Sequence, residues 1–233
     1  MPRDWGVTAR LVDARPDWSI AVFDLLTLPG DLLLIVGVLG ILYLVDVWRH
    51  RDISDNPLCS PHTATTFAIV FGGLALIVFL ESIFAAPRPP DAWHAISASP
   101  YAFPSGHTMA ATVCWGALAW RHWHAPALHR VLSVGLLVTV VGISRMILGV
   151  HYLPDILAAL GFGIAYLAIA SKLATAPARA FAGAITLAVL AILASGAGTR
   201  PVLAFIGTAA AAIGWYVTER PLVRSHIRAV LAR

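Results

Sequence analysis

Residues 64–86 read ATTFAIVFGGLALIVFLESIFAA, and Glu81 is the only charged residue in this run of 23 positions. Crossing the hydrocarbon core of a bilayer as a helix takes about 20 consecutive apolar residues. A charged side chain inside such a helix is costly, and one that stands there usually has a role. The stretch is therefore predicted to be a transmembrane helix with a carboxylate near one end that needs an explanation.

The rest of the chain has the same character. Of its 233 residues, 59% are hydrophobic and 12% are charged, and the mean hydropathy is +0.80. Typical globular domains have about 25% charged residues, so this chain has too few to cover a water-facing surface. We predict an all-α fold, a polytopic transmembrane helical bundle with about six to seven spans. The predicted spans are residues 31–48, 64–86, 105–123, 131–149, 155–171, 179–197 and 202–217.

Residues 1–29 are predicted to form an amino-terminal interfacial segment. Positions 18–28 are mostly apolar, but Asp24 interrupts them and Pro29-Gly30 closes them, so the stretch is too short to cross the bilayer. A short or re-entrant span is the alternative. Residues 30–218 are predicted to form the membrane domain, and residues 219–233 a basic cytoplasmic tail.

Arginine and lysine are distributed unequally between the two sides of the predicted bundle. One side holds ten of them and the opposite side holds six. Cytoplasmic loops carry the excess of positive charge, so the side with six is predicted to face outward from the cell membrane. The ten are Arg49, Arg51, Arg121, Arg130, Lys172, Arg179, Arg220, Arg224, Arg228 and Arg233, and the six are Arg3, Arg10, Arg15, Arg88, Arg145 and Arg200. No basic run of five or more residues occurs, so no nucleic-acid partner is predicted.

Three groups of polar residues stand at outward ends of the predicted spans. The first is Glu81 with Arg88-Pro89, at and just past the end of the span 64–86. Alone, this group is weak evidence of function, because an arginine and a proline after a helix often mark a plain boundary.

The second group is Pro104-Ser105-Gly106-His107, which opens the span 105–123. Proline and serine favour helix starts, and a helix amino terminus offers backbone N–H groups and a positive dipole end to a phosphate. Gly106 lets a ligand come close to the backbone, and His107 in the first turn could pass a proton to it. An ordinary helix cap followed by an interfacial histidine explains the same residues.

The third group is Ser144-Arg145, then His151 after five residues, then Asp155 after three more. A bound anion would explain an arginine near the end of a span. Pro154 suits the first position of the next span, which leaves His151 just before that helix and Asp155 in its first turn. Asp155 can then accept a hydrogen bond from one ring nitrogen of His151 and make the other a better nucleophile. A His–Asp pair that only ties two helix ends together is the alternative.

Together these residues resemble the type 2 phosphatidic acid phosphatase superfamily of membrane lipid phosphatases. Its pattern is Lys, six residues and Arg-Pro; then Pro-Ser-Gly-His; then Ser-Arg, five residues, His, three residues and Asp. Residues 104–107 match the second motif completely and residues 144–155 the third, whereas the first motif matches only at Arg88 and Pro89.

The resemblance implies a role for each matched residue. His151 would attack phosphorus and form a phosphohistidine, Asp155 would orient His151, and His107 would protonate the departing alkoxide and then activate water. The residues implied to hold the phosphoryl oxygens are Arg88, Ser105, Gly106, Arg145 and, as a weaker candidate, Ser144. The superfamily needs no metal, and neither a metal nor another cofactor is expected here.

Glu81 stands where the superfamily pattern has lysine. Three explanations are open: Glu81 pairs with an arginine, Arg200 or an amino-terminal arginine supplies the missing charge, or catalysis is weakened or lost. We expect Glu81→Lys to preserve or raise phosphatase activity.

The expected function is that of an integral membrane lipid phosphatase, with residues 30–218 as its phosphatase domain, that hydrolyses a phosphomonoester or diphosphate of a lipid. A lipid phosphotransferase, in which another hydroxyl replaces water, and a catalytically silent lipid-binding membrane protein are the alternatives. Phosphatidate, phosphatidylglycerol phosphate and polyprenyl phosphates or diphosphates all fit as substrates, and the oligomeric state stays open.

Overall fold

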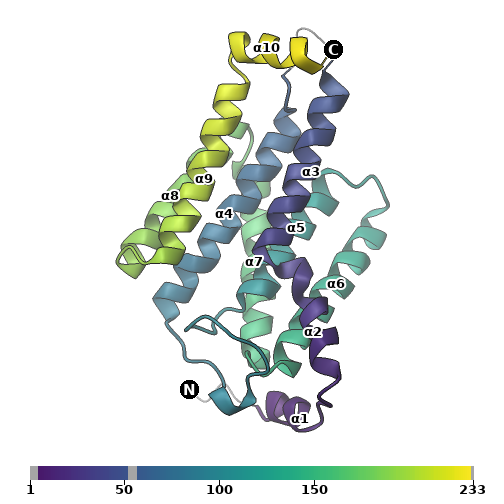
Figure 1. The fold of residues 1–233 in the computed structure, drawn as a ribbon, viewed down its shortest axis with the longest axis vertical. Coiled ribbons are helices and arrows are strands. Elements are labelled where there is room, and N and C mark those ends of the chain that lie inside the picture. The colour runs from purple at the N-terminus through teal and green to yellow at the C-terminus, as the bar shows by residue number, and fades with distance from the viewer. Residues whose placement is uncertain (1–4, 52–56, 232–233) are drawn as a thin grey trace.

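A computed structural model describes residues 5–51 and 57–231 of the chain (Figure 1). Within those ranges the regular structure is entirely helical. Arg3 and Arg233, which entered the predicted charge bias, lie outside the described residues, as do the outermost parts of the predicted segments 1–29 and 219–233.

Among the described residues, six helices are long and apolar enough to cross a membrane. They are α3 (Leu32–His50), α4 (Pro61–Phe84), α6 (Ala127–Ile147), α7 (Leu153–Leu173), α8 (Pro177–Ser195) and α9 (Thr199–Thr218). Each corresponds to one predicted span. The expected all-α polytopic bundle is therefore confirmed, and the chain is a multi-span membrane protein.

The remaining predicted span, residues 105–123, is the shorter helix α5 (Gly106–Arg121). At about 1.5 Å per residue, its 16 residues reach about 24 Å, less than the hydrocarbon core of about 30 Å. α5 packs on α4, α6 and α7, and Met109 and Cys114 are fully buried. A short helix is tolerated at this place because protein rather than lipid surrounds it.

The helix α5 ends two residues before the predicted span does. His122 caps it, and the imidazole Nε2 lies 2.9 Å from the Thr66 hydroxyl of α4. This polar contact holds the chain at the turn that follows the helix.

The predicted site residues lie at one end of the bundle. In Figure 1, α4, α6 and α8 end at the lower side of the bundle, and α5, α7 and α9 begin there. The long connection 85–105, which includes the 3-10 helix η2 (Asp91–Trp93), covers the same end. All three polar groups found in the sequence therefore lie at one end of the molecule.

The amino-terminal segment packs against this same end of the bundle. It forms α1 (Val7–Asp13), α2 (Ser19–Thr27) and the 3-10 helix η1 (Leu28–Gly30), with α1 and α2 against α6 and η1 against α5. The predicted helix at 18–28 is thus α2 with part of η1. Arg15 fastens the segment, since its Nη1 donates hydrogen bonds to the carbonyls of Ile147 at 2.8 Å and Trp93 at 3.2 Å.

The predicted basic tail contains an amphipathic helix, α10 (Pro221–Leu231). Figure 1 shows α10 lying across the opposite end of the bundle, roughly perpendicular to α9. Apolar side chains such as Leu222 and Val230 are exposed beside Arg224 and Arg228, a composition typical of helices that lie in a membrane interface.

Candidate active site

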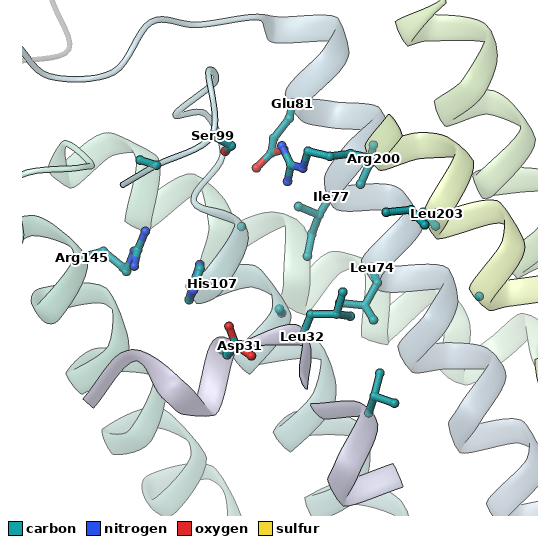
Figure 2. Close-up of a pocket in the computed structure, with 18 of the residues that line it drawn as sticks. Asp31, Leu32, Leu74, Ile77, Glu81, Ser99, His107, Arg145, Arg200 and Leu203 are labelled. Atoms are coloured by element: carbon teal, nitrogen blue, oxygen red, sulfur yellow. The ribbon is translucent and has the colours of Figure 1, made fainter. Parts of the chain in front are cut away.

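A cavity of about 440 Å³ opens at the end of the bundle where α4 ends and α5 begins. Its walls come from η1, α3, α4, α5, α6, α9 and the connection 85–105 (Figure 2). Five of the eight candidate residues line it: Arg88, Gly106, His107, Arg145 and His151. Residues from three separate motifs thus meet around one space large enough for a phosphate group and part of a lipid.

His151 is held from three directions. Its ring is buried, with 1% of its surface exposed. Its carbonyl accepts a hydrogen bond from the Thr8 hydroxyl at 3.1 Å, its Nε2 lies 3.0 Å from Arg88 Nη1, and its Nδ1 lies 3.6 Å from Asp155 Oδ2. A guanidinium can only donate, so Nε2 is the acceptor and the ring proton is on Nδ1, on the side of Asp155. The lone pair of Nε2 therefore points toward Arg88 and the cavity.

Asp155 organises the beginning of α7. Its Oδ2 accepts a hydrogen bond from the Tyr152 backbone N–H at 2.9 Å, which forms part of a capping box. Its backbone carbonyl accepts a hydrogen bond from the Ser105 N–H at 3.1 Å. This second bond joins the start of α7 to the start of α5, so the motif that carries His151 and the motif that carries His107 are fixed to each other.

Ser105 is the N-cap of α5, as the sequence predicts. Its hydroxyl lies 2.9 Å from that of Thr108, one turn into the helix, and the side chain is fully buried outside the cavity lining. Gly106 and His107 form the first turn and line the cavity, where backbone N–H groups have no intrahelical partner. In Figure 2 the His107 ring points into the cavity between Asp31 and Arg145.

Arg88 bridges the connection 85–105 and the His151 motif. Its Nη1 donates to the Val150 carbonyl at 2.7 Å, its Nη2 donates to the Ser99 hydroxyl at 2.8 Å, and its Nε donates to the Ser99 carbonyl. Burial lowers the pKa of the Arg88 guanidinium, while the nearby Glu81 carboxylate opposes that change. The arginine is thus fixed in place with its cationic end beside the His151 ring.

Arg145 brings a second buried cation to the cavity, with 4% of its surface exposed. Among the described residues its Nε has no hydrogen-bond partner. Ser144 beside it behaves differently, because its hydroxyl donates to the Val140 carbonyl at 2.7 Å within α6 and does not line the cavity. A buried guanidinium with donor capacity to spare suits an anionic ligand.

A model of the PAP2 superfamily matches residues 62–179, about half of the chain. The chain belongs to the PAP2 superfamily. The resemblance found from the motifs is therefore confirmed, and the matched region contains all eight candidate site residues.

Two further comparisons agree with this family. Phosphatidylglycerophosphatase B of Bacillus subtilis (strain 168) is 32% identical over 81 residues, which cover 32% of this chain and 40% of that protein. The chain thus matches less than half of the length of this curated relative. The crystal structure of the first transmembrane PAP2 type phosphatidylglycerolphosphate phosphatase from Bacillus subtilis superposes with a TM-score of 0.58, at 22% identity, over 72% of this chain and 82% of that one. This likeness shows that the two proteins share a fold.

Glu81 departs from the PAP2 motif and pairs with an arginine, as the first of the three explanations proposed. Its Oε2 lies 2.6 Å from Nη1 of Arg200, the second residue of α9, and Figure 2 shows the two side chains facing each other at the cavity wall. Arg200 lies beyond the region that the PAP2 model matches.

The amino-terminal segment supplies parts of the site that motif reasoning missed. Gly30 and Asp31 line the cavity, and Thr8 holds the His151 backbone. A Cβ atom on Gly30 would lie 2.3 Å from the His107 carbonyl oxygen, so only glycine allows η1 to come so close to α5. The Pro29-Gly30 pair was the available signal, but it also fits a simple turn before a span. Ser99, which holds Arg88, carries no sequence signal at all.

The cavity continues away from the histidines as an apolar groove. Leu32, Leu74 and Leu203 line its inner part. A second cavity of about 330 Å³ shares Val36, Phe71 and Gly207 with the first and extends along α3, α4 and α9 as far as Trp215. The polar site thus opens into an apolar channel that follows the transmembrane helices.

Proposed function

We infer that the protein is an integral membrane lipid phosphatase that hydrolyses a phosphomonoester or diphosphate of a lipid through a phosphohistidine at His151. One observation carries the proposal: His151 Nδ1 lies 3.6 Å from Asp155 Oδ2 and its Nε2 lies 3.0 Å from Arg88 Nη1, in a cavity shared with His107 and Arg145. That arrangement suits a nucleophile aimed at a bound anion.

The proposed reaction has two steps. In the first, His151 Nε2 attacks phosphorus, the bond from phosphorus to the lipid oxygen breaks, and His107 gives its proton to the leaving alkoxide. In the second, His107 takes a proton from a water molecule, the water oxygen attacks phosphorus, and the P–N bond breaks to release phosphate and restore His151. The Asp155 carboxylate stabilises the imidazole when it becomes positively charged.

Cationic and helix-terminal groups would stabilise the charge that develops on the phosphoryl oxygens. A phosphoryl oxygen would replace His151 Nε2 as the acceptor of the Arg88 Nη1 proton, and Arg145, which lines the same cavity, would supply further donors. The α5 amino terminus at Gly106 adds backbone N–H groups. Ser105 and Ser144 have weaker support, because their hydroxyls are engaged with Thr108 and Val140. Every step uses side chains of this chain, so we propose a reaction that is independent of metal ions.

The apolar groove supports a lipid as the substrate, because it lies directly beside the polar cavity and can bury hydrocarbon. The relative from Bacillus subtilis is a phosphatidylglycerophosphatase by name. Phosphatidylglycerol phosphate is therefore the first substrate to test, followed by phosphatidate and polyprenyl phosphates and diphosphates.

Purified protein in detergent micelles should release phosphate from at least one of these lipids. His151→Ala should abolish release and also abolish transfer of radiolabelled phosphate to the protein, while binding of the lipid remains. His94→Ala is the matched control, since His94 lies in the connection 85–105, bonded to the Pro89 carbonyl and outside the cavity lining. Full activity in His151→Ala would refute the proposed nucleophile.

The same assay separates the alternatives. Label that moves from the lipid to an added alcohol or sugar in preference to water would identify a phosphotransferase. Lipid binding without phosphate release from any lipid would identify a catalytically silent binding protein.

We also propose that the protein lies in the cell membrane with the cavity facing outward. The positive-inside bias supports this orientation. The two native cysteines, Cys59 and Cys114, are buried, so an introduced cysteine can report its side. In intact cells a membrane-impermeant maleimide should label Asp91→Cys, at the cavity end, and should label His124→Cys, at the opposite end, only after lysis. The reverse pattern would overturn the orientation.

A further inference from the structure

We propose that Arg200 is a phosphate-binding residue of the cavity and that Glu81 is the positioning residue that holds it there. The pair would replace the cation that the PAP2 pattern carries at position 81. The proposal rests on the proposed function and assigns a role to a residue outside all three motifs.

The position of Glu81 is unusual for a carboxylate. Its side chain is 3% exposed and lines the cavity together with His107 and His151. A Cβ atom on Gly106 would lie 3.1 Å from Glu81 Oε1, so the carboxylate reaches the amino terminus of α5, where a phosphate is expected to bind. A lone anion at that place would repel the substrate, and a buried charge without a partner is strongly unfavourable.

Arg200 offsets both the repulsion of an anionic substrate by Glu81 and the cost of burying the Glu81 charge. Its Nη1 lies 2.6 Å from Glu81 Oε2. An arginine in the first turn of a helix stands at the positive end of the helix dipole, which is unfavourable without a compensating anion. Glu81 is that anion, and the packing of α9 on α4 brings the two residues together.

The guanidinium retains capacity for a second ligand. Arginine has five N–H donors in a rigid fork, and only one nitrogen is engaged by Glu81. Among the described residues the Arg200 side chain forms no other hydrogen bond or ion pair, and 46% of it remains exposed. Because Arg200 lines the same cavity as Arg88 and Arg145, the remaining donors can reach a phosphoryl oxygen while Glu81 holds the fork in place.

The pair also changes what is expected of Glu81→Lys. With Arg200 opposite, this single substitution places two cations side by side, so it should not raise activity. The gain expected from the sequence requires removal of Arg200 as well. Glu81→Lys combined with Arg200→Ala restores one cation at the position where the PAP2 pattern has it.

Four variants test the proposal through the KM for the lipid, kcat, and inhibition by inorganic phosphate. Arg200→Ala should weaken phosphate inhibition and raise KM by about 10- to 100-fold, the usual range for a lost charge-assisted hydrogen bond. Arg200→Ala with Glu81→Gln should stay impaired, because no cation returns, whereas Arg200→Ala with Glu81→Lys should recover most of the loss. Arg224→Ala, which removes an arginine 4.0 Å from Glu219 at the other end of the bundle, is the control and should match the wild type.

Arg200→Ala combined with Glu81→Gln, the neutral double variant, distinguishes a role of the pair in binding phosphate from a purely structural role. If the pair only joins α4 to α9, then replacing both charges with neutral groups should restore wild-type KM and wild-type phosphate inhibition, and the proposal is wrong.

Thermal unfolding with added inorganic phosphate keeps the two proposals separable, because a ligand stabilises the protein that binds it whether or not catalysis occurs. A wild-type protein that releases no phosphate from lipids, yet is stabilised by phosphate in an Arg200-dependent way, overturns the phosphatase function and supports the role of Arg200. A phosphate response that is equal in the wild type and the neutral double variant overturns the role of Arg200, and so does the absence of any response in the wild type.

Discussion

Replacement of Gly30 by alanine should damage the site from a position outside the PAP2 motifs. A Cβ atom at Gly30 would lie 2.3 Å from the carbonyl oxygen of His107 and 2.9 Å from its Cα. Ordinary van der Waals contact begins at 3.4 Å, and the atoms it meets belong to backbone, so they cannot rotate away. The wall formed by η1 and the start of α5 must therefore move apart by about 1 Å, a displacement that can cost about 100-fold in rate.

The expected effect on stability follows from the same contact. Overpacking of a well-packed interior typically costs about 1 to 3 kcal/mol. We therefore expect Gly30→Ala to unfold at a lower temperature than the wild type and to show a kcat lower by up to about 100-fold. KM should change less, because the apolar groove between α3, α4 and α9 is untouched.

The assay is phosphate release from phosphatidylglycerol phosphate in micelles, with thermal unfolding measured on the same samples. Gly37→Ala is the matched control, since Gly37 also belongs to the amino-terminal part of the fold but has no atom within 4 Å of its ideal Cβ position. Alanine is favoured over glycine inside a helix by about 0.5 to 1 kcal/mol, so this variant should be as stable as the wild type or more so. Wild-type stability and kcat in Gly30→Ala would refute the described packing of η1 on α5.

Three further predictions test other features. Arg88→Lys keeps the charge but loses the fork that reaches Ser99, Val150 and His151, so kcat should fall by about 100-fold or more in the micelle assay; activity within a fewfold of the wild type would contradict this. Prolonged treatment with EDTA should leave the rate unchanged, and a loss of activity that a divalent cation restores would show that a metal takes part. Burial raises the pKa of the Cys59 thiol to about 12, so the thiolate is scarce at pH 8, and a thiol reagent should modify Cys59 only after unfolding; rapid modification of the native protein would show that this loop is open.

The helices could be predicted from the sequence because each depends mainly on the residues within it and next to it. A long apolar run is sufficient to predict a transmembrane helix, and every predicted span corresponds to a helix. Caps are local as well: Ser105 precedes α5 and Asp155 lies in the first turn of α7, as their sequence context indicates. The predicted span 105–123 runs two residues past the end of α5, where His122 contacts Thr66, a pairing that hydropathy cannot reveal.

The side-chain contacts between distant parts of the chain could not be predicted in the same way. Thr8 binds the carbonyl of His151 over a separation of 143 residues, and no pattern around position 8 announces it. For Glu81 the sequence offered several arginines as partners, and only the packing of α9 on α4 selects Arg200. In a helix bundle several helix ends can lie next to one another, so the sequence identifies possible partner residues. Only the tertiary structure shows which of them are in contact.

The hydrogen bond between the Ser105 amide and the Asp155 carbonyl fixes the starts of α5 and α7 to each other. The amino termini of α5 and α7 are joined through backbone atoms, so the bond does not depend on any side chain, and the two helices also pack along their lengths. α3, by contrast, has few contacts with α4. Any widening that admits a bulky molecule from the bilayer therefore costs least along α3, and it leaves the spacing of the two imidazoles unchanged while the entrance opens.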